Sequence, residues 1–254
     1  MLPAVLSGSL VGFTLGLVGG GGSILATPLL LYAVGVRDPH TAIGTSALAV
    51  SVNAYVNLAG HAWKGHVRWK CGLTFALVGM LGTVAGSTIG KIIDGHALLF
   101  VFGLLMLAVS ALMMRPKSAA LQVELSDRAT CVKTAGLALV TGAASGFFGI
   151  GGGFLIVPAL MAATGMSMIN AVGTSLVSVG TFGLATAANY ALSGLVDWTV
   201  AGEFIAGGVL GGTAGLLLAT RLAGYRQILN RILAGMIFGV ALYVLINSGS
   251  EFLN

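Results

Sequence analysis

Long runs of apolar residues, separated by short polar stretches, make up most of this chain. None of the runs alternates apolar and polar residues with the period of two that a membrane β-barrel strand needs. Continuous apolar runs predict helices, because a segment in lipid must satisfy its backbone polar groups internally. Ten helical segments are expected, at 2–18, 23–36, 41–61, 70–90, 96–114, 132–148, 153–165, 169–190, 199–220 and 226–246.

Composition supports a membrane protein. Hydrophobic residues make up 57% of the 254 positions and charged residues only 7%, against roughly a quarter charged in soluble domains. Residues 1–18 lack a basic leader and are interpreted as mature structure rather than as a signal peptide. Cys71 and Cys131 indicate neither a disulfide framework nor a metal site. The sequence therefore predicts an all-α polytopic membrane protein.

A glycine-rich break occurs twice. Residues 16–28 read GLVGGGGSILATP and residues 146–158 read GFFGIGGGFLIVP. Consecutive glycines carry a backbone entropy cost and proline lacks an N–H donor, so neither run continues a stable helix. Broken backbone at membrane depth is tolerated only where it is buried in protein or lines a cavity. The two breaks therefore mark the region to search for function.

Other blocks repeat with the same spacing. AIGTSAL at 42–48 matches AVGTSLV at 171–177, and GHVRW at 65–69 matches GLVDW at 194–198. A fixed offset over several blocks indicates internal duplication. We expect two repeats of five segments each, with this organisation: an N-terminal repeat at 1–114, a polar cytoplasmic linker at 115–131 and a C-terminal repeat at 132–254.

Loop charges predict that the repeats are inverted. Loop 61–70 carries three basic residues, whereas its equivalent carries only Asp197. In the second half the basic loop is 221–231, and its equivalent has Lys91 balanced by Asp94. Positive loops face the cytoplasm, so equivalent units are expected to insert upside down, with both termini outside. Each repeat then opens with a glycine-broken helical hairpin, which is either re-entrant or two short tilted spans.

Glycine runs followed by a helix suggest an anion site. Successive backbone N–H groups and the positive end of a helix bind anions without a buried cation. The alternative is close helix packing, which explains Gly82, Gly86 and Gly90 well. Nearby hydroxyls donate to a ligand or cap a helix. The expected substrate-binding residues are Gly20, Gly21, Gly22, Ser23, Thr45, Ser46, Gly151, Gly152, Gly153, Thr174 and Ser175.

Four further polar residues lie within or beside apolar segments. Asn53 and Asn57 share one face of segment 41–61, and Asn189 lies in the matching stretch of the second half. They could line a pathway or make interhelical hydrogen bonds. Glu203 lies one turn into its segment, where interfacial anchoring and a gating role are both open.

The two break motifs, together with Gly-Thr-Ser-Ala at 44–47 and Gly-Thr-Ser-Leu at 173–176, resemble the sulfite exporter TauE/SafE family of membrane permeases. The resemblance covers nearly the whole chain. It implies transport of sulfite or an organosulfonate across the bacterial inner membrane by a multi-pass protein. Ile150 interrupts the second glycine run where the first has Gly20.

The function expected is therefore that of a secondary transporter for a small sulfur-containing oxoanion. The alternative is an anion channel with the glycine tips as its filter. A third reading, an intramembrane hydrolase on Ser46 or Ser175, lacks a nearby base. We expect no enzyme activity, cofactor or metal. The expected partners are the anion and the lipid bilayer, with nucleic acid excluded and a homo-oligomer left open.

Overall fold

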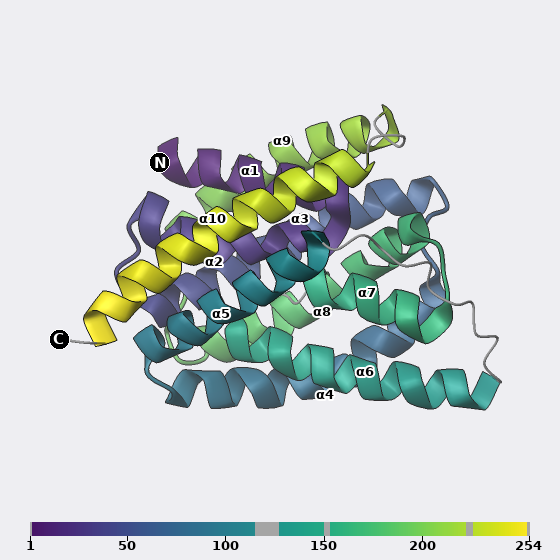
Figure 1. Ribbon diagram of the computed structural model, residues 1–254, viewed down its shortest axis with the longest axis horizontal. Coiled ribbons are helices and arrows are strands. Elements are labelled where there is room, and N and C mark those ends of the chain that lie inside the picture. Colours follow the sequence, from purple (N-terminus) through teal and green to yellow (C-terminus); the bar gives the residue numbers. More distant parts are fainter. Residues whose placement is uncertain (1, 115–126, 150–152, 222–225, 253–254) are drawn as a thin grey trace.

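The computed structural model describes residues 2–114, 127–149, 153–221 and 226–252, and within them it is a bundle of helices without strands (Figure 1). Most of the expected linker, residues 115–126, and two expected site residues, Gly151 and Gly152, lie outside the described residues. The helices are α1 (Leu2–Val18), η1 (Gly19–Leu25), α2 (Ala26–Pro28), η2 (Leu29–Val34), α3 (Pro39–Trp63), α4 (Trp69–Ile92), α5 (Gly95–Met114), α6 (Asp127–Phe148), α7 (Gly153–Thr164), α8 (Met168–Ala191), α9 (Trp198–Arg221) and α10 (Arg226–Phe252).

Helix length and composition confirm the all-α membrane class. Four helices in the described part of the chain are long and apolar enough to cross a membrane: α3, α4, α8 and α9. They form two pairs of duplicated segments, α3 with α8 and α4 with α9. Of the helices beside the glycine breaks, α1 has 17 residues and α7 has 12, as the sequence predicts, whereas α6 has 22 and begins before the expected segment 132–148. We call residues at equivalent positions of the two halves repeat-mates.

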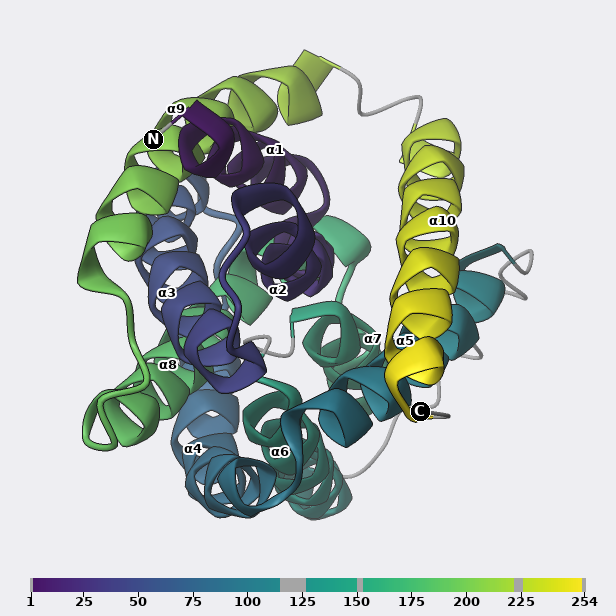
Figure 2. The ribbon, with the colours of Figure 1, turned by 90° about the vertical axis from the view of Figure 1, so that its left-hand side faces the viewer.

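The two halves exchange helices. The first helix of each half packs along the fourth helix of the other: α1 lies against α9, and α6 lies against α4 (Figure 2). Glycines make these contacts close, since a Cβ atom at Gly12 would overlap the Gly208 carbonyl oxygen. A Cβ atom at its repeat-mate Gly142 would likewise overlap the Gly79 carbonyl oxygen. The packing role expected for the small-residue stripes is confirmed: Gly82, Gly86, Gly90, Gly211 and Gly215 all face backbone carbonyls of the partner helix.

Helices α3 and α8 form the centre and run antiparallel. Thr45, near the start of α3, accepts a 2.9 Å hydrogen bond from the backbone N–H of Asp197, which follows α8. Its repeat-mate Thr174, near the start of α8, accepts a 3.0 Å bond from the N–H of Arg68, which follows α3. The start of each helix therefore lies beside the end of the other.

The backbone turns are duplicated along with the helices. Six glycines of the described chain have positive φ, a conformation that other residues adopt only with strain. They form three pairs of repeat-mates: Gly19 with Gly149, Gly35 with Gly165, and Gly65 with Gly194. Both halves thus turn at the same points.

Each half opens with a hairpin. Helix α1 contacts both η1 and η2, so the chain doubles back at Gly19, and α6 contacts α7 in the same way after Gly149. Gly19 lies against Val172 near the start of α8, and Gly149 lies against Ile43 near the start of α3. Because α3 and α8 are antiparallel, the two turning points lie towards opposite ends of the bundle. Element η1, which follows the first turning point, packs against α7, which follows the second.

The last helices of the two halves, α5 and α10, cross each other on one side of the bundle (Figure 2). The hydroxyl of Ser110 on α5 donates a 2.8 Å bond to the Ala234 carbonyl on α10. The start of α1 and the end of α10 lie at the same end of the bundle (Figure 1).

Candidate functional site

The first glycine break is a buried turn of 3₁₀ helix. Gly20, Gly21, Gly22 and Ser23 all belong to η1, and both Gly22 and Ser23 are buried. The first turn of a helix carries N–H groups without intrahelical acceptors, and these glycines occupy that turn. At Gly22, the Thr14 hydroxyl and the Leu15 backbone of α1 occupy the space that a Cβ atom would need, so this glycine packs closely against α1. In the second half, the buried Gly153 begins α7.

Each threonine of the duplicated blocks accepts a hydrogen bond from the opposite half. Thr45 and Thr174 are both fully buried, and each accepts an N–H from the loop that follows the other half's central helix. Gly44 packs against the Leu195 carbonyl, and its repeat-mate Gly173 packs against the His66 carbonyl. These blocks therefore join the halves at both ends of the α3–α8 pair.

The serines beside them are less symmetric. Ser46 donates to the Ile43 carbonyl at 2.9 Å and shares a 2.9 Å hydroxyl contact with Thr27, which lies inside the first break motif. Ser175 donates to the Val172 carbonyl at 2.8 Å, and the repeat-mate of Thr27 is Val157. Among the described residues, a hydroxyl–hydroxyl contact links the first break to its Thr-Ser block but does not link the second.

Asn53 and Asn57 place a polar stripe where α3 meets α9. A Cβ atom at Gly208 would overlap the Asn53 carboxamide, and one at Gly212 would lie 2.6 Å from the Asn57 nitrogen. Asn57 donates to the Asn53 carbonyl at 2.9 Å. The Asn53 carboxamide is fully buried, and neither of its polar atoms has a hydrogen-bond partner among the described residues. The repeat-mate of Asn53 is Phe182, packed on Gly79, so this stripe belongs to the first half alone.

Asn189 lies elsewhere, near the end of α8, where it contacts Lys91 of α4. The Lys91 ammonium donates to the Asn189 side-chain oxygen at 2.8 Å and to its backbone carbonyl at 3.0 Å. Asp94, which offsets the charge of Lys91 in the loop count, accepts the N–H groups of His96 and Ala97 at the start of α5. Glu203 is half-buried on α9, one turn after Trp198.

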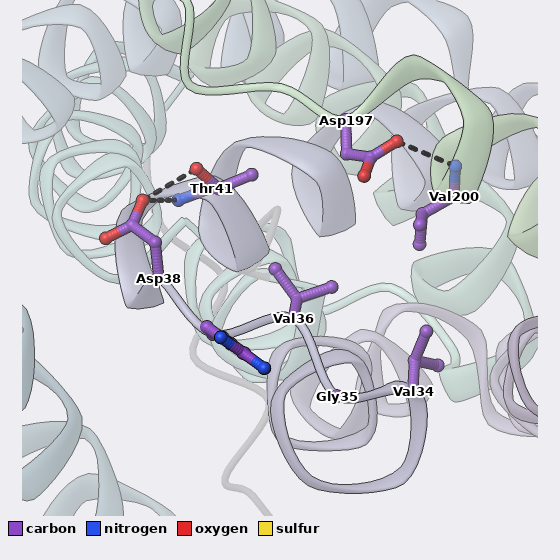
Figure 3. Close-up of a pocket in the computed structure, with 8 residues that line it drawn as sticks. Val34, Gly35, Val36, Asp38, Thr41, Asp197 and Val200 are labelled. Carbon is purple, nitrogen blue, oxygen red and sulfur yellow. Dashed lines mark hydrogen bonds between the residues drawn. The ribbon is translucent and has the colours of Figure 1, made fainter.

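A cavity of about 400 Å³ opens at the end of the bundle where α3 and α9 begin (Figure 3). Asp38 and Asp197 each cap one of these helices, through Thr41 and Val200 respectively. Burial raises the pKa of Asp38, but hydrogen bonds from the Thr41 hydroxyl and N–H outweigh it, so the pKa lies below its ordinary value. The cavity is lined by Val34, Gly35, Val36, Arg37, Asp38, Thr41, Asp197 and Val200. It lies apart from the glycine breaks and was not foreseen from the sequence.

The described residues do not support a hydrolytic or metal site. A serine nucleophile needs a base within hydrogen-bond reach, whereas Ser46 and Ser175 contact only hydroxyl and carbonyl groups. No group of three His, Cys, Asp or Glu side chains in the described part of the chain is placed to share a metal ion.

Comparison with known proteins now decides the family. The sulfite exporter TauE/SafE family profile matches residues 4–244. The chain belongs to this family. A "Probable membrane transporter protein" of Xylella fastidiosa (strain 9a5c) is 59% identical over 247 residues, which cover 96% of this chain and 95% of the relative. "Probable membrane transporter protein YunE" of Bacillus subtilis is 27% identical over 240 residues, covering 86% and 88%. No solved structure matches the chain significantly.

The chain is thus a membrane transporter of the TauE/SafE family. Of the expected site residues, the structure brings Ser46 to the first break motif through Thr27 and connects Thr45 and Thr174 to the opposite half. It places Asn189 at the end of α8, away from Asn53 and Asn57. The contacts of Lys91 with Asn189 were not predicted, because they join segments that lie far apart in the sequence.

Proposed function

We propose that this TauE/SafE transporter moves a small sulfur-containing oxoanion, such as sulfite or an organosulfonate, across the cytoplasmic (inner) membrane by alternating access. The anion would be held by backbone N–H groups of the two glycine breaks and by the hydroxyls beside them. Such donors suit a compact oxoanion, which accepts hydrogen bonds on all its oxygens.

The observation that carries the proposal is the crossed packing of the two breaks. Gly19 of the first half lies on Val172 of the second, Gly149 of the second lies on Ile43 of the first, and η1 packs against α7. Each turning point therefore rests on the central helix of the opposite half. A movement of one half against the other must change the surroundings of both breaks together.

The inverted insertion is part of the same proposal. Antiparallel packing of α3 and α8 supports it, because two duplicated spans of opposite direction need opposite insertion. The basic loop 61–70, placed in the cytoplasm, puts the Thr174 end of the bundle inside and the Thr45 end outside. Inverted repeats of this kind allow one set of contacts to open inward and its mirror set to open outward.

The test is uptake of labelled sulfite into proteoliposomes, with sulfate and methanesulfonate as competing anions. We expect saturable uptake that is accelerated by unlabelled sulfite on the opposite side, because a carrier exchanges faster than it returns empty. Uptake without such exchange, together with single-channel currents, would establish the channel instead. Replacing Gly21 by leucine should abolish uptake while the protein still inserts, and full activity in that variant would contradict the site.

A further inference from the structure

Lys91 is held where the two halves meet, at the end of the bundle that also carries the cavity. It belongs to the last turn of α4, in the first half, and all three of its ammonium contacts are in the second half. It donates to the backbone and side-chain oxygens of Asn189 at 3.0 and 2.8 Å and to the Ser193 hydroxyl at 2.9 Å. The ammonium also lies 5.9 Å from the centre of the Tyr190 ring.

Among the described residues, this ammonium has only neutral hydrogen-bond partners. The carboxylate of Asp94, three residues after Lys91, accepts hydrogen bonds from two backbone N–H groups at the start of α5. The described residues supply Lys91 with carbonyl and hydroxyl oxygens, and its side chain is half-buried. A charge held in this way, without a counter-ion, attracts an anion more strongly than one already paired.

Lys91 and Thr45 both form hydrogen bonds with the same segment, residues 189–197. Residues 189–197 contact Lys91 through Asn189 and Ser193, and they contact α3 through Gly44 and Thr45. Asn189 adds bonds to the Ser87 and Thr88 hydroxyls at 2.6 and 3.1 Å. Releasing Lys91 would therefore loosen one of the two attachments that close this end.

The opposite end of the bundle is closed differently. The repeat-mate of Asn189 is Gly60, and the repeat-mate of Ser87 is Leu216. The Leu216 side chain packs directly on Gly60, so an apolar contact replaces the hydrogen-bonded network. Among the described residues, the Lys91 contacts therefore have no hydrogen-bonded equivalent at the Gly60–Leu216 position.

We propose that Lys91 is the binding station for the transported anion at the outer end, and that its contacts with Asn189 and Ser193 form a latch which the anion releases. The inference rests on the proposed function for the direction and the cargo. An oxoanion offers the Lys91 ammonium a charged acceptor in place of the Asn189 carbonyl groups. The Ser193 hydroxyl, which accepts from Lys91, can then donate to the anion.

A single ammonium with neutral neighbours should bind singly charged anions in preference to doubly charged ones. One positive charge compensates one negative charge, and burying a second, unpaired negative charge is costly. The station therefore favours singly charged oxoanions, such as hydrogen sulfite or a sulfonate, over sulfate.

The binding test uses the purified full-length protein and sulfite, with thermal unfolding as the readout. Lys91→Met should weaken sulfite binding about tenfold, as expected for the loss of one charge-assisted hydrogen bond. Lys91→Arg should keep most of it. Arg37→Gln is the matched control, since it removes an exposed cation at the same end and should leave binding unchanged. Equal affinity in the wild type and Lys91→Met would overturn the station, whereas a wild type without any sulfite response would contradict the proposed function.

The latch is tested separately, without any anion. In a background with Cys71 and Cys131 replaced by serine, the reporter is Thr186→Cys, a fully buried position one turn before Asn189. An impermeant thiol reagent added outside spheroplasts should label this reporter several-fold faster in the Lys91→Met variant than in the reporter protein that retains Lys91. A reporter at the repeat-mate position, Asn57→Cys, should show no such gain. Unchanged labelling of the Thr186→Cys reporter in both Lys91→Met and Lys91→Gln would overturn the latch.

Discussion

The hydroxyl of Ser51 donates a 2.7 Å hydrogen bond to the carbonyl of Gly180, and these two residues are repeat-mates. When two halves are related by a rotation, equivalent residues contact each other only if they lie close to the rotation axis. In the proposed inverted arrangement, the axis that relates the halves passes beside Ser51 and Gly180, where α3 packs against α8. The Tyr55 ring covers Gly180, and a Cβ atom there would lie 2.7 Å from it.

Substitutions at this crossing should separate packing from hydrogen bonding. Ser51→Ala removes one hydrogen bond and should cost about 1 kcal/mol or less of unfolding free energy, as such bonds do within membranes. Gly180→Leu should cost more and should stop transport, because the side chain would force Tyr55 and α3 away. Thermal unfolding in detergent and proteoliposome uptake measure the two effects. Equal behaviour of the two variants would contradict this account of the crossing.

Removing either buried threonine hydroxyl should loosen one end of the bundle. Thr45→Val leaves the Asp197 N–H without an acceptor, and Thr174→Val does the same to Arg68. Each should lower the unfolding free energy by about 1–3 kcal/mol, the cost of an unmade buried hydrogen bond. Thr45→Ser and Thr174→Ser keep the hydroxyl and serve as controls. Valine variants as stable as the serine variants would show that these bonds do not hold the ends.

The glycine contacts between the exchanged helices should tolerate no side chain. Gly12→Val and Gly142→Val each place atoms into a facing carbonyl, and neither α9 nor α4 can give way without losing its own packing. We expect both variants to lose most folded protein, measured by gel filtration after detergent extraction. Gly202→Ala, on α9 where nothing lies within 4 Å, should be neutral. Normal yield for the valine variants would contradict the close contact.

Asp94 should make the stability of the folded protein depend on pH in the acidic range. Backbone hydrogen bonds from Ala97 and His96 hold the pKa of this carboxyl below its ordinary value of 3.8. A lowered pKa means that the contribution of Asp94 is fully present above pH 3.8 and is lost as the pH falls through the lower, folded-state value. Asp94→Asn keeps a capping oxygen but does not titrate. The stability advantage of the wild type over Asp94→Asn should therefore shrink below pH 3.8, in unfolding midpoints measured against pH. A constant difference across that range would contradict the assignment.

Most of the architecture could be read from the sequence. Apolar runs predicted the helices, and the fixed offset of the Gly-Thr-Ser blocks predicted duplicated turns, which the paired glycines at 19 and 149 confirm. Small-residue spacing predicted the close contacts of Gly82 and Gly86. These features are local in sequence, so a single chain carries them.

Contacts between distant segments could not be predicted. The sequence does not say that α1 leaves its own half to pack on α9, or that Thr45 meets Asp197. Nor does the sequence reveal that Lys91 contacts Asn189 and Ser193, or that Asp94 accepts two N–H groups of the next helix. A carboxylate beside a helix start has a competing use that a charge count ignores.

The exchange of helices between the halves has a consequence for biosynthesis. The partner surface of α1 is on α9, so the first helix enters the membrane long before the residues that it packs against have been made. The glycine face of α1 must therefore stay in contact with lipid or with the translocation machinery until nearly the whole chain has left the ribosome. Neither half synthesised alone has that surface, and co-expression of the two halves as separate polypeptides should yield stable protein only when both are present.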